Sequence, residues 1–156
     1  MEIVEDDLSG QAIADFLAEH IADMRATSPP ESVHALDLEG LRKPEVTFWT
    51  VWDADTLLGC GALKELDGTH GELKSMRTSA RVKQRGVASA LVQHILHAAQ
   101  IRGYERLSLE TGSMAFFEPA RRLYEKFGFQ PCGPFSDYAV DPNSVFMTKV
   151  LSPAHY

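Results

Sequence analysis

The chain has 156 residues, the length of one ordinary domain, with 44% hydrophobic and 24% charged residues. This composition is typical of a soluble globular protein and excludes extended disorder, collagen-like repeats and a coiled coil. Its apolar runs are shorter than the roughly 18 residues that a membrane span needs. The acidic N-terminus also lacks the pattern of a signal peptide. We therefore expect a single domain over residues 1–156, in the cytoplasm and without a membrane partner.

The net charge of −7 is distributed unevenly along the chain. The first 45 residues carry eleven acidic and three basic residues, whereas the stretch from Leu73 to Tyr104 carries six basic residues and no acidic one. An acidic protein with one basic stretch is a poor candidate for nucleic-acid binding and a better one for holding a small polyanion. The two cysteines, Cys60 and Cys132, form neither a disulfide framework nor a zinc-ligand pattern, so we expect no metal.

The first half of the chain predicts helices followed by a strand meander. Residues 1–7 predict a short strand, and apolar residues at helical spacing predict a helix over residues 9–25. Ser9 is placed to cap the start of this helix, and a pair of prolines follows its end. A second, short helix is predicted from Ser32. Three β-branched or apolar stretches separated by turns then predict three strands, over residues 46–52, 57–66 and 70–78.

The second half alternates helices and strands. Apolar residues at helical spacing predict a helix that begins near Val87 and ends at Gly103. A short strand over residues 106–110 and a helix that ends at Gly128 follow. The final strand is predicted over residues 145–151. The order β-α-α-β-β-β-α-β-α-β indicates a mixed α/β layer architecture.

A basic, glycine-containing loop joins a predicted strand to the helix that begins near Val87. A helix N-terminus presents unpaired N–H groups and a partial positive charge, so it attracts anions. Gly86 lets the backbone approach a phosphate, and Arg81, Lys83 and Arg85 add positive charge. The pattern is neither a P-loop nor a Rossmann fingerprint. By itself it predicts either a phosphate site or a solvated turn.

Two motifs resemble those of the GNAT superfamily of acetyl-CoA-dependent N-acetyltransferases. The segment KQRGVA, residues 83–88, is similar to the family's Q/R-x-x-G-x-G/A loop, with Lys83 at the first position. A helix motif of the family, A-x-x-L-Y-x-x-x-G-F, is met by Ala120, Leu123, Tyr124, Gly128 and Phe129. Phe117 stands where the family often has Asn. The segments 28–77 and 133–147 resemble a bacterial branch of the family, the YsnE-like proteins.

The resemblance implies an α/β (α+β mixed) fold, with a mixed, mostly antiparallel sheet of six to seven strands and about four helices. It also implies acetyl-CoA as cosubstrate, an amine of a small molecule or protein as acceptor, and a homodimer as one assembly. The backbone of residues 76–78 would pair with the pantetheine arm, and the basic loop would hold the pyrophosphate. The implied cofactor-binding residues are Met76, Arg77, Thr78, Lys83, Gln84, Arg85, Gly86, Val87, Ala88 and Ser89.

Acetyl transfer from a thioester to an amine needs an acid for the departing thiolate and an acceptor for the amine proton. Tyr124 is the candidate acid, because a phenol of pKa ~10 can protonate a thiolate whose thiol has a pKa of ~8.5; the alternative is a core aromatic. Glu72 is the candidate base, with bound water and His70 as alternatives. Strand alternation places Glu72, Lys74 and Met76 on one face, where Lys74 could instead pair with the carboxylate.

The remaining candidates are weaker. Trp49, Trp52 and Tyr138 are candidates for lining a substrate cleft, although aromatic residues in strands more often belong to the core. Cys60 is interpreted as a small buried residue. A non-catalytic acetyl-CoA-binding regulatory module is the second hypothesis, and the retained Tyr124 and Glu72 favour the enzyme instead.

Overall fold

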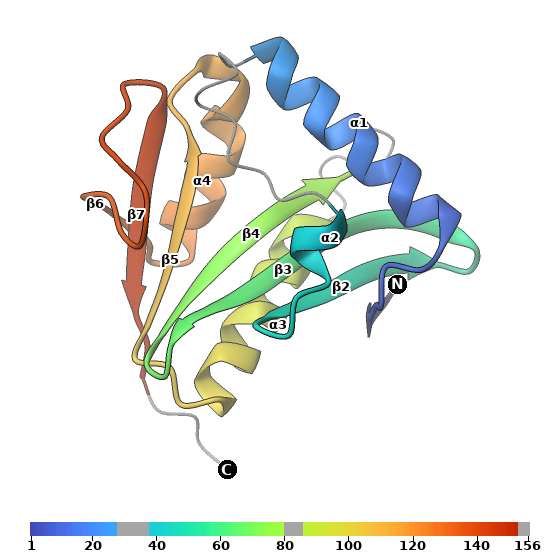
Figure 1. The fold of residues 1–156 in the computed structure, drawn as a ribbon, viewed down its shortest axis with the longest axis horizontal. Coiled ribbons are helices and arrows are strands. Elements are labelled where there is room, and N and C mark those ends of the chain that lie inside the picture. The colour runs from blue at the N-terminus through green and yellow to red at the C-terminus, as the bar shows by residue number, and fades with distance from the viewer. Residues whose placement is uncertain (28–37, 80–85, 153–156) are drawn as a thin grey trace.

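The computed structural model describes residues 1–27, 38–79 and 86–152, and within them seven strands form one sheet (Figure 1). The order in the sheet is β1-β2-β3-β4-β5-β7-β6. The strands are β1 (Glu2–Glu5), β2 (Val46–Asp53), β3 (Thr56–Asp67), β4 (His70–Thr78), β5 (Arg106–Gly112), β6 (Gln130–Cys132) and β7 (Ser144–Val150). The helices are α1 (Gln11–Thr27), α2 (Leu38–Leu41), α3 (Val87–Ile101) and α4 (Glu118–Lys126), with a 3-10 turn η3 at Ala115–Phe117.

Neighbouring strands are antiparallel except β4 and β5, which are parallel. The predicted mixed, mostly antiparallel sheet with about four helices is therefore confirmed. In the part of the chain that the structure describes, we find no helix long and apolar enough to cross a membrane.

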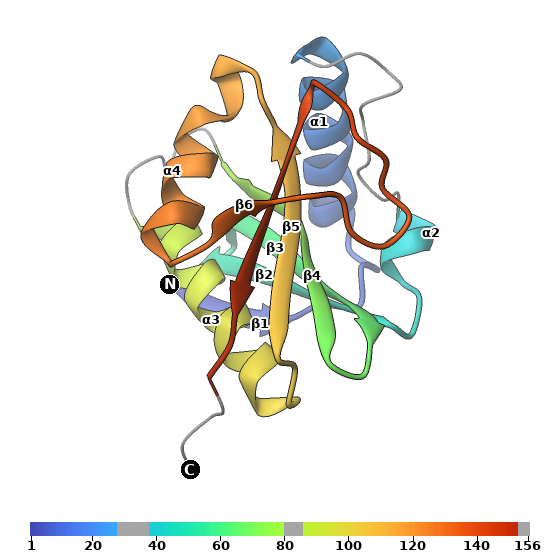
Figure 2. The same ribbon diagram turned by 90° about the vertical axis from the view of Figure 1, so that its left-hand side faces the viewer.

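The two faces of the sheet bury separate apolar clusters, with α1 and α2 over one face and α3 and α4 over the other (Figure 2). The larger cluster, on the α3 side, joins strand residues such as Leu73 and Leu107 to helix residues such as Leu91. The smaller cluster, on the α1 side, joins Phe16 of α1 to Ala62 of β3. Each large apolar side chain that is fully buried contributes about 1.5–3 kcal/mol.

A β-bulge interrupts β4. Lys74 lies opposite Ala62 of the α1-side cluster, and β4 then has one residue more than β3 before the strands are in register again. Ser75 takes a positive φ of 55° here. The extra residue reverses the alternation of side chains, so Met76 packs against the α3-side cluster, whereas Glu72 lies on the other face. The prediction of one common face is therefore wrong for Met76, because strict alternation does not anticipate a bulge.

Strands β4 and β5 separate at the bulge. Their register runs from the pair His70–Arg106 to the pair Leu73–Leu109. Beyond that pair β5 continues along β7 to Gly112, while β4 continues along β3 to its end. Figure 1 shows the two strands diverging toward their C-terminal ends. Within the described residues, no strand pairs with this side of β4 after Leu73.

The start of α1 differs from its prediction. The hydroxyl of Ser9 donates to Asp7 Oδ1 at 2.6 Å instead of capping the helix, and α1 begins at Gln11. The predicted cap is therefore wrong, because a local side-chain contact competes for the serine. The helix predicted from Ser32 falls partly outside the described residues, as do the prolines before it; α2 covers its described end.

Strand β6 was not among the predicted elements. It has three residues and contains Pro131, so it presents neither the length nor the residue types by which a strand is identified. It forms the edge of the sheet next to β7, where a proline is tolerated. The other predicted strands and helices are present, with ends that shift by a few residues.

Candidate active site

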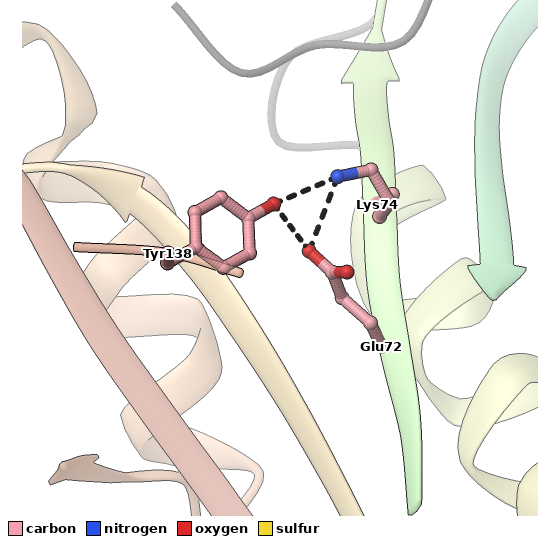
Figure 3. Close-up of polar contacts among 3 residues, drawn as sticks. All are labelled: Glu72, Lys74 and Tyr138. Carbon is pink, nitrogen blue, oxygen red and sulfur yellow. Dashed lines mark hydrogen bonds and ion pairs between the residues drawn. The ribbon is translucent and has the colours of Figure 1, made fainter. Parts of the chain in front are cut away.

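Three polar side chains meet on the α1-side face, next to the separation of β4 from β5 (Figure 3). Lys74 Nζ lies 3.1 Å from Glu72 Oε2 and donates to Tyr138 Oη at 2.8 Å. The hydroxyl of Tyr138 donates to the same Glu72 oxygen at 2.6 Å. Glu72 is only 2% exposed. We call these residues the Glu72–Lys74–Tyr138 cluster.

Aromatic packing holds Tyr138 in this cluster. It belongs to the segment between β6 and β7, and its ring lies 5.2 Å from that of Phe135 and 5.5 Å from that of Phe146. Lys74 Nζ lies 5.4 Å from the centre of the Tyr138 ring, a cation–π distance. The sequence predicts Tyr138 only as one of three aromatic candidates for a substrate cleft, because nothing in a local pattern joins residues 66 positions apart.

The electrostatics of the cluster keep its phenol neutral. Burial raises the pKa of Tyr138, and the negative charge of Glu72 and the hydrogen bond to that carboxylate raise it further. The phenol therefore remains a donor to Glu72 at neutral pH. With the Lys74 ammonium as a second donor, Glu72 Oε2 receives two hydrogen bonds inside the protein.

His70, the alternative base, lies on the same face of the sheet but bonds elsewhere. Its Nε2 is 2.7 Å from Ser108 Oγ, which is 2.9 Å from Thr148 Oγ1. Burial, together with the positive charge of Arg106, lowers the pKa of His70. The ring also contacts Phe135 at 5.8 Å. His70 therefore supports the β6–β7 segment and has no direct bond to Glu72.

Tyr124, the candidate acid, lies on the opposite side of the sheet. It is 6% exposed, belongs to the α3-side cluster, and makes an edge contact with Phe129 at 5.8 Å. Burial raises its pKa, so the phenol keeps its proton at neutral pH. This position agrees with a core role, and the role as an acid stays a prediction. Glu72 and Tyr124 therefore lie on opposite faces of the sheet.

The start of α3 has the backbone form that the phosphate prediction requires. Gly86 precedes the helix with φ 79° and ψ 11°, and no side chain caps the helix there. Among the described residues, a Cβ atom at Gly86 would meet nothing within 4 Å. Three predicted loop residues, Lys83, Gln84 and Arg85, lie outside the described residues.

Residues 76–78, which are predicted to pair with the pantetheine arm, would do so through their backbone. The one charged side chain among them, Arg77, is engaged with α1. Arg77 Nη1 lies 2.7 Å from Asp23 Oδ2 on α1, and its guanidinium stacks over the Phe16 ring at 5.4 Å. The side chain therefore ties β4 to α1. Met76 and Thr78, its neighbours, complete the segment that β5 leaves unpaired.

Other candidates belong to the core or the surface. Trp49 packs in the α3-side cluster against His94, and Trp52 donates to Thr50 Oγ1 at 2.8 Å. Neither tryptophan therefore lines the Glu72–Lys74–Tyr138 cluster. Cys60 is fully buried, which confirms its interpretation as a small buried residue, and this burial raises the pKa of its thiol to about 12. Among the described residues no group of His, Cys, Asp and Glu could hold a metal ion.

Phe117 packs against the end of β5. Its ring packs directly on the α-carbon of Gly112 at the end of β5, where a Cβ would collide with it. Arg121 Nη1 donates to the Gly112 carbonyl at 2.7 Å, which fixes the same strand end. The departure from the family's usual Asn is therefore accommodated by a glycine beneath the ring.

The fold and these positions agree with the sequence comparison. The chain matches the acetyltransferase (GNAT) family model over residues 13–129. The chain belongs to this family. The uncharacterized N-acetyltransferase YsnE of Bacillus subtilis (strain 168) is 64% identical over 151 residues, 97% of this chain and 100% of the relative. The uncharacterized N-acetyltransferase YedL of Escherichia coli (strain K12) is 53% identical over 149 residues, 96% and 94% of the two chains.

A solved GNAT-fold structure supports the same conclusion at the level of the fold. The crystal structure of an aminoglycoside 6'-N-acetyltransferase complexed with coenzyme A superposes with a TM-score of 0.71 at 19% identity, covering 100% of both chains. The predicted GNAT resemblance, its YsnE-like branch and the N-acetyltransferase class are confirmed.

Proposed function

We propose that this N-acetyltransferase binds acetyl-CoA along β4 and the start of α3 and transfers the acetyl group directly to an amine of a small molecule or protein. The observation that carries the proposal is the separation of β4 from β5 directly after a buried carboxylate, Glu72. The separation leaves a strand edge for an extended ligand, and the carboxylate offers an acceptor for a proton.

The proposed position of coenzyme A rests on two backbone features. Among the described residues no strand pairs with the edge of β4 at residues 76–78 on the β5 side, so its N–H and C=O groups can bond the amide groups of the pantetheine arm. At the end of this strand, the N–H groups of Val87, Ala88 and Ser89 form the first turn of α3 behind Gly86. Such a turn attracts a pyrophosphate.

In the proposed reaction the neutral amine attacks the thioester carbonyl carbon, and a tetrahedral oxyanion forms. A backbone N–H of β4 near Met76 is the donor for that oxyanion. The C–S bond then breaks, and the thiolate takes the phenol proton of Tyr124. Burial raises the pKa of Tyr124, so the phenol is protonated before this step, and it takes a proton back from solvent afterwards. The amine proton passes to Glu72, directly or through a water, and returns from there to solvent.

The compartment is also part of the proposal. The two cysteines, Cys60 and Cys132, are free, which fits a reducing compartment such as the cytoplasm. One seven-stranded sheet includes strands from both ends of the chain, which supports a single acetyltransferase domain. The homodimer and the absence of nucleic-acid partners stay predictions.

The function is tested by thiol release from acetyl-CoA in the presence of a panel of amines, with products identified by mass spectrometry. We expect release that depends on both the enzyme and the amine, and an amide product one acetyl group heavier than the amine. Tight coenzyme A binding in calorimetry without release for any amine would favour the non-catalytic module instead.

The coenzyme A position is tested by two matched glycine variants at opposite ends of α3. Gly86 and Gly103 have φ values of 79° and 82°, and a Cβ at either would meet nothing within 4 Å. Valine therefore introduces similar left-handed strain of at least about 1–2 kcal/mol at both. We expect Gly86→Val to weaken coenzyme A binding about tenfold to a hundredfold and Gly103→Val to leave it unchanged. Equal affinities would place the phosphate site elsewhere.

A further inference from the structure

The Glu72–Lys74–Tyr138 cluster has hydrogen-bonding capacity that the described residues do not use. An ammonium has three N–H donors, and Lys74 directs two of them to Glu72 Oε2 and Tyr138 Oη. The same carboxylate oxygen accepts both bonds made to Glu72, and Oε1 has no partner in the described part of the chain. The side chains of Lys74 and Glu72 are only 8% and 3% exposed.

This arrangement does not serve stability well. Removing an ion pair from water costs a desolvation penalty that the attraction between the charges often fails to offset, so an apolar pair of similar volume stabilises as well or better. This penalty falls when a ligand supplies further hydrogen-bond partners to Lys74 Nζ and Glu72 Oε1.

The charges of the cluster select the kind of ligand. Lys74 and Glu72 together are a neutral dipole, with the ammonium 3.1 Å from one carboxylate oxygen. A simple cationic amine is attracted by Glu72 but repelled by Lys74. A molecule that carries an amine beside a carboxylate presents two charges in the complementary order, so it satisfies the unused N–H and the unused oxygen together.

We infer that the acceptor is an amine with a carboxylate on the neighbouring carbon, as in an α-amino acid, and that Lys74 is the specificity-determining residue that binds this carboxylate. The inference rests on the proposed function, in which the acceptor's amine reaches Glu72. The ammonium form of the acceptor binds Glu72 Oε1 and gives up a proton to this oxygen. The resulting neutral amine then attacks the thioester carbonyl carbon. Tyr138 is a positioning residue, because its hydroxyl bonds both charged groups and fixes their spacing.

The test compares acceptors that share one side chain and carry a carboxylate, a carboxamide or a hydrogen on the carbon next to the amine. Phenylalanine, phenylalaninamide and phenethylamine form one series, and leucine, leucinamide and isopentylamine form another. The readout is kcat/KM from thiol release with wild type, Lys74→Met and Lys74→Arg. We expect wild type to prefer the amino acid by at least about tenfold, the effect of one hydrogen bond to a charged group. We expect Lys74→Met to reduce this ratio toward one and Lys74→Arg to retain most of it.

A purely structural role of Lys74 would lower kcat/KM for all three members of a series equally and leave the ratio unchanged, which would overturn the inference. Wild-type preference for the amide or the plain amine would also overturn it while leaving the proposed function intact, and this comparison does not depend on whether a variant folds. Failure to acetylate any acceptor would overturn the proposed function and this inference with it.

Discussion

Two tyrosine–glutamate pairs lie at different places in the sheet and make the same hydrogen bond in different surroundings. Tyr104 donates to Glu65 Oε1 at 2.8 Å, and Tyr138 donates to Glu72 Oε2 at 2.6 Å. Glu65 is exposed, and its bond satisfies the hydroxyl of a tyrosine from the α3-side cluster. Glu72 is buried and bonds Lys74 as well.

The difference shows how to separate a structural bond from a functional one. The Tyr104–Glu65 bond lets a core tyrosine keep its hydroxyl partner at the surface, which is the usual arrangement for a buried phenol. The second pair instead removes a carboxylate and an ammonium from water, next to the open edge of β4. Only the second arrangement combines buried opposite charges with an open strand edge, so we assign the ligand to it. The pair at Glu65 therefore supplies matched controls for the pair at Glu72.

The largest effect is expected from a third tyrosine, Tyr124. Tyr124→Phe keeps the ring in the α3-side cluster and removes only the hydroxyl, so the fold and coenzyme A affinity should be nearly unchanged. If the phenol protonates the thiolate, kcat falls about 10²–10⁴-fold. Tyr104→Phe, in the same cluster, is the control and should keep full kcat. Full activity in Tyr124→Phe would mean that Tyr124 is a core residue and not the acid.

A smaller loss is expected from Tyr138→Phe. It removes the donor to Glu72 and an acceptor for Lys74, so kcat/KM should fall about tenfold to a hundredfold. Tyr104→Phe should lose about 1 kcal/mol of unfolding free energy and no activity. Thiol release and urea unfolding measure the two effects. Equal stability losses with equal activities would mean that both bonds are structural.

The smallest effect is spectroscopic. The chain has four tyrosines, and burial raises the pKa of Tyr104, Tyr124 and Tyr138 above that of a free phenol. At about pH 10, where free phenols are half ionised, the native protein should therefore show little tyrosinate absorbance. Denatured protein should show about half of the full tyrosinate signal at the same pH. Native titration of these three tyrosines together near ~10 would contradict the burial described above.

Much of the fold could be predicted from the sequence because hydrophobic periodicity follows burial directly. The α3 helix and the β2–β4 meander show their periods clearly, and the GNAT motifs identify Gly86 and Tyr124. The Glu72–Lys74–Tyr138 cluster could be predicted only in part. Residues two apart on one strand share a face, which indicates the pairing of Glu72 with Lys74.

The remaining features depend on tertiary contacts that leave no local pattern. The bulge at Ser75 inserts one residue into β4 without a glycine or proline to mark it. The face predicted for Met76 is therefore wrong. Strand β6 forms only because β7 offers an edge. Tyr138 reaches Glu72 through a segment that aromatic contacts with Phe146 hold against the sheet.

Replacing Glu72 leaves Lys74 buried without its counter-charge, which can cost about 3–5 kcal/mol. Thermal unfolding of Glu72→Gln therefore accompanies any activity measurement. The double variant Glu72→Gln with Lys74→Met removes both charges and keeps the measurement possible if the single variant unfolds. Glu65→Gln is the matched control for a carboxylate that accepts a tyrosine hydroxyl.

The most direct test of the central claim is the pH dependence of kcat/KM for Glu72→Gln and Glu65→Gln. We expect Glu72→Gln to lose about 10²-fold at neutral pH and to recover partly as pH rises, because free amine becomes abundant and the missing proton acceptor matters less. Glu65→Gln should follow wild type throughout. A Glu72→Gln profile that coincides with wild type at every pH would contradict the account and make water or another group the proton acceptor.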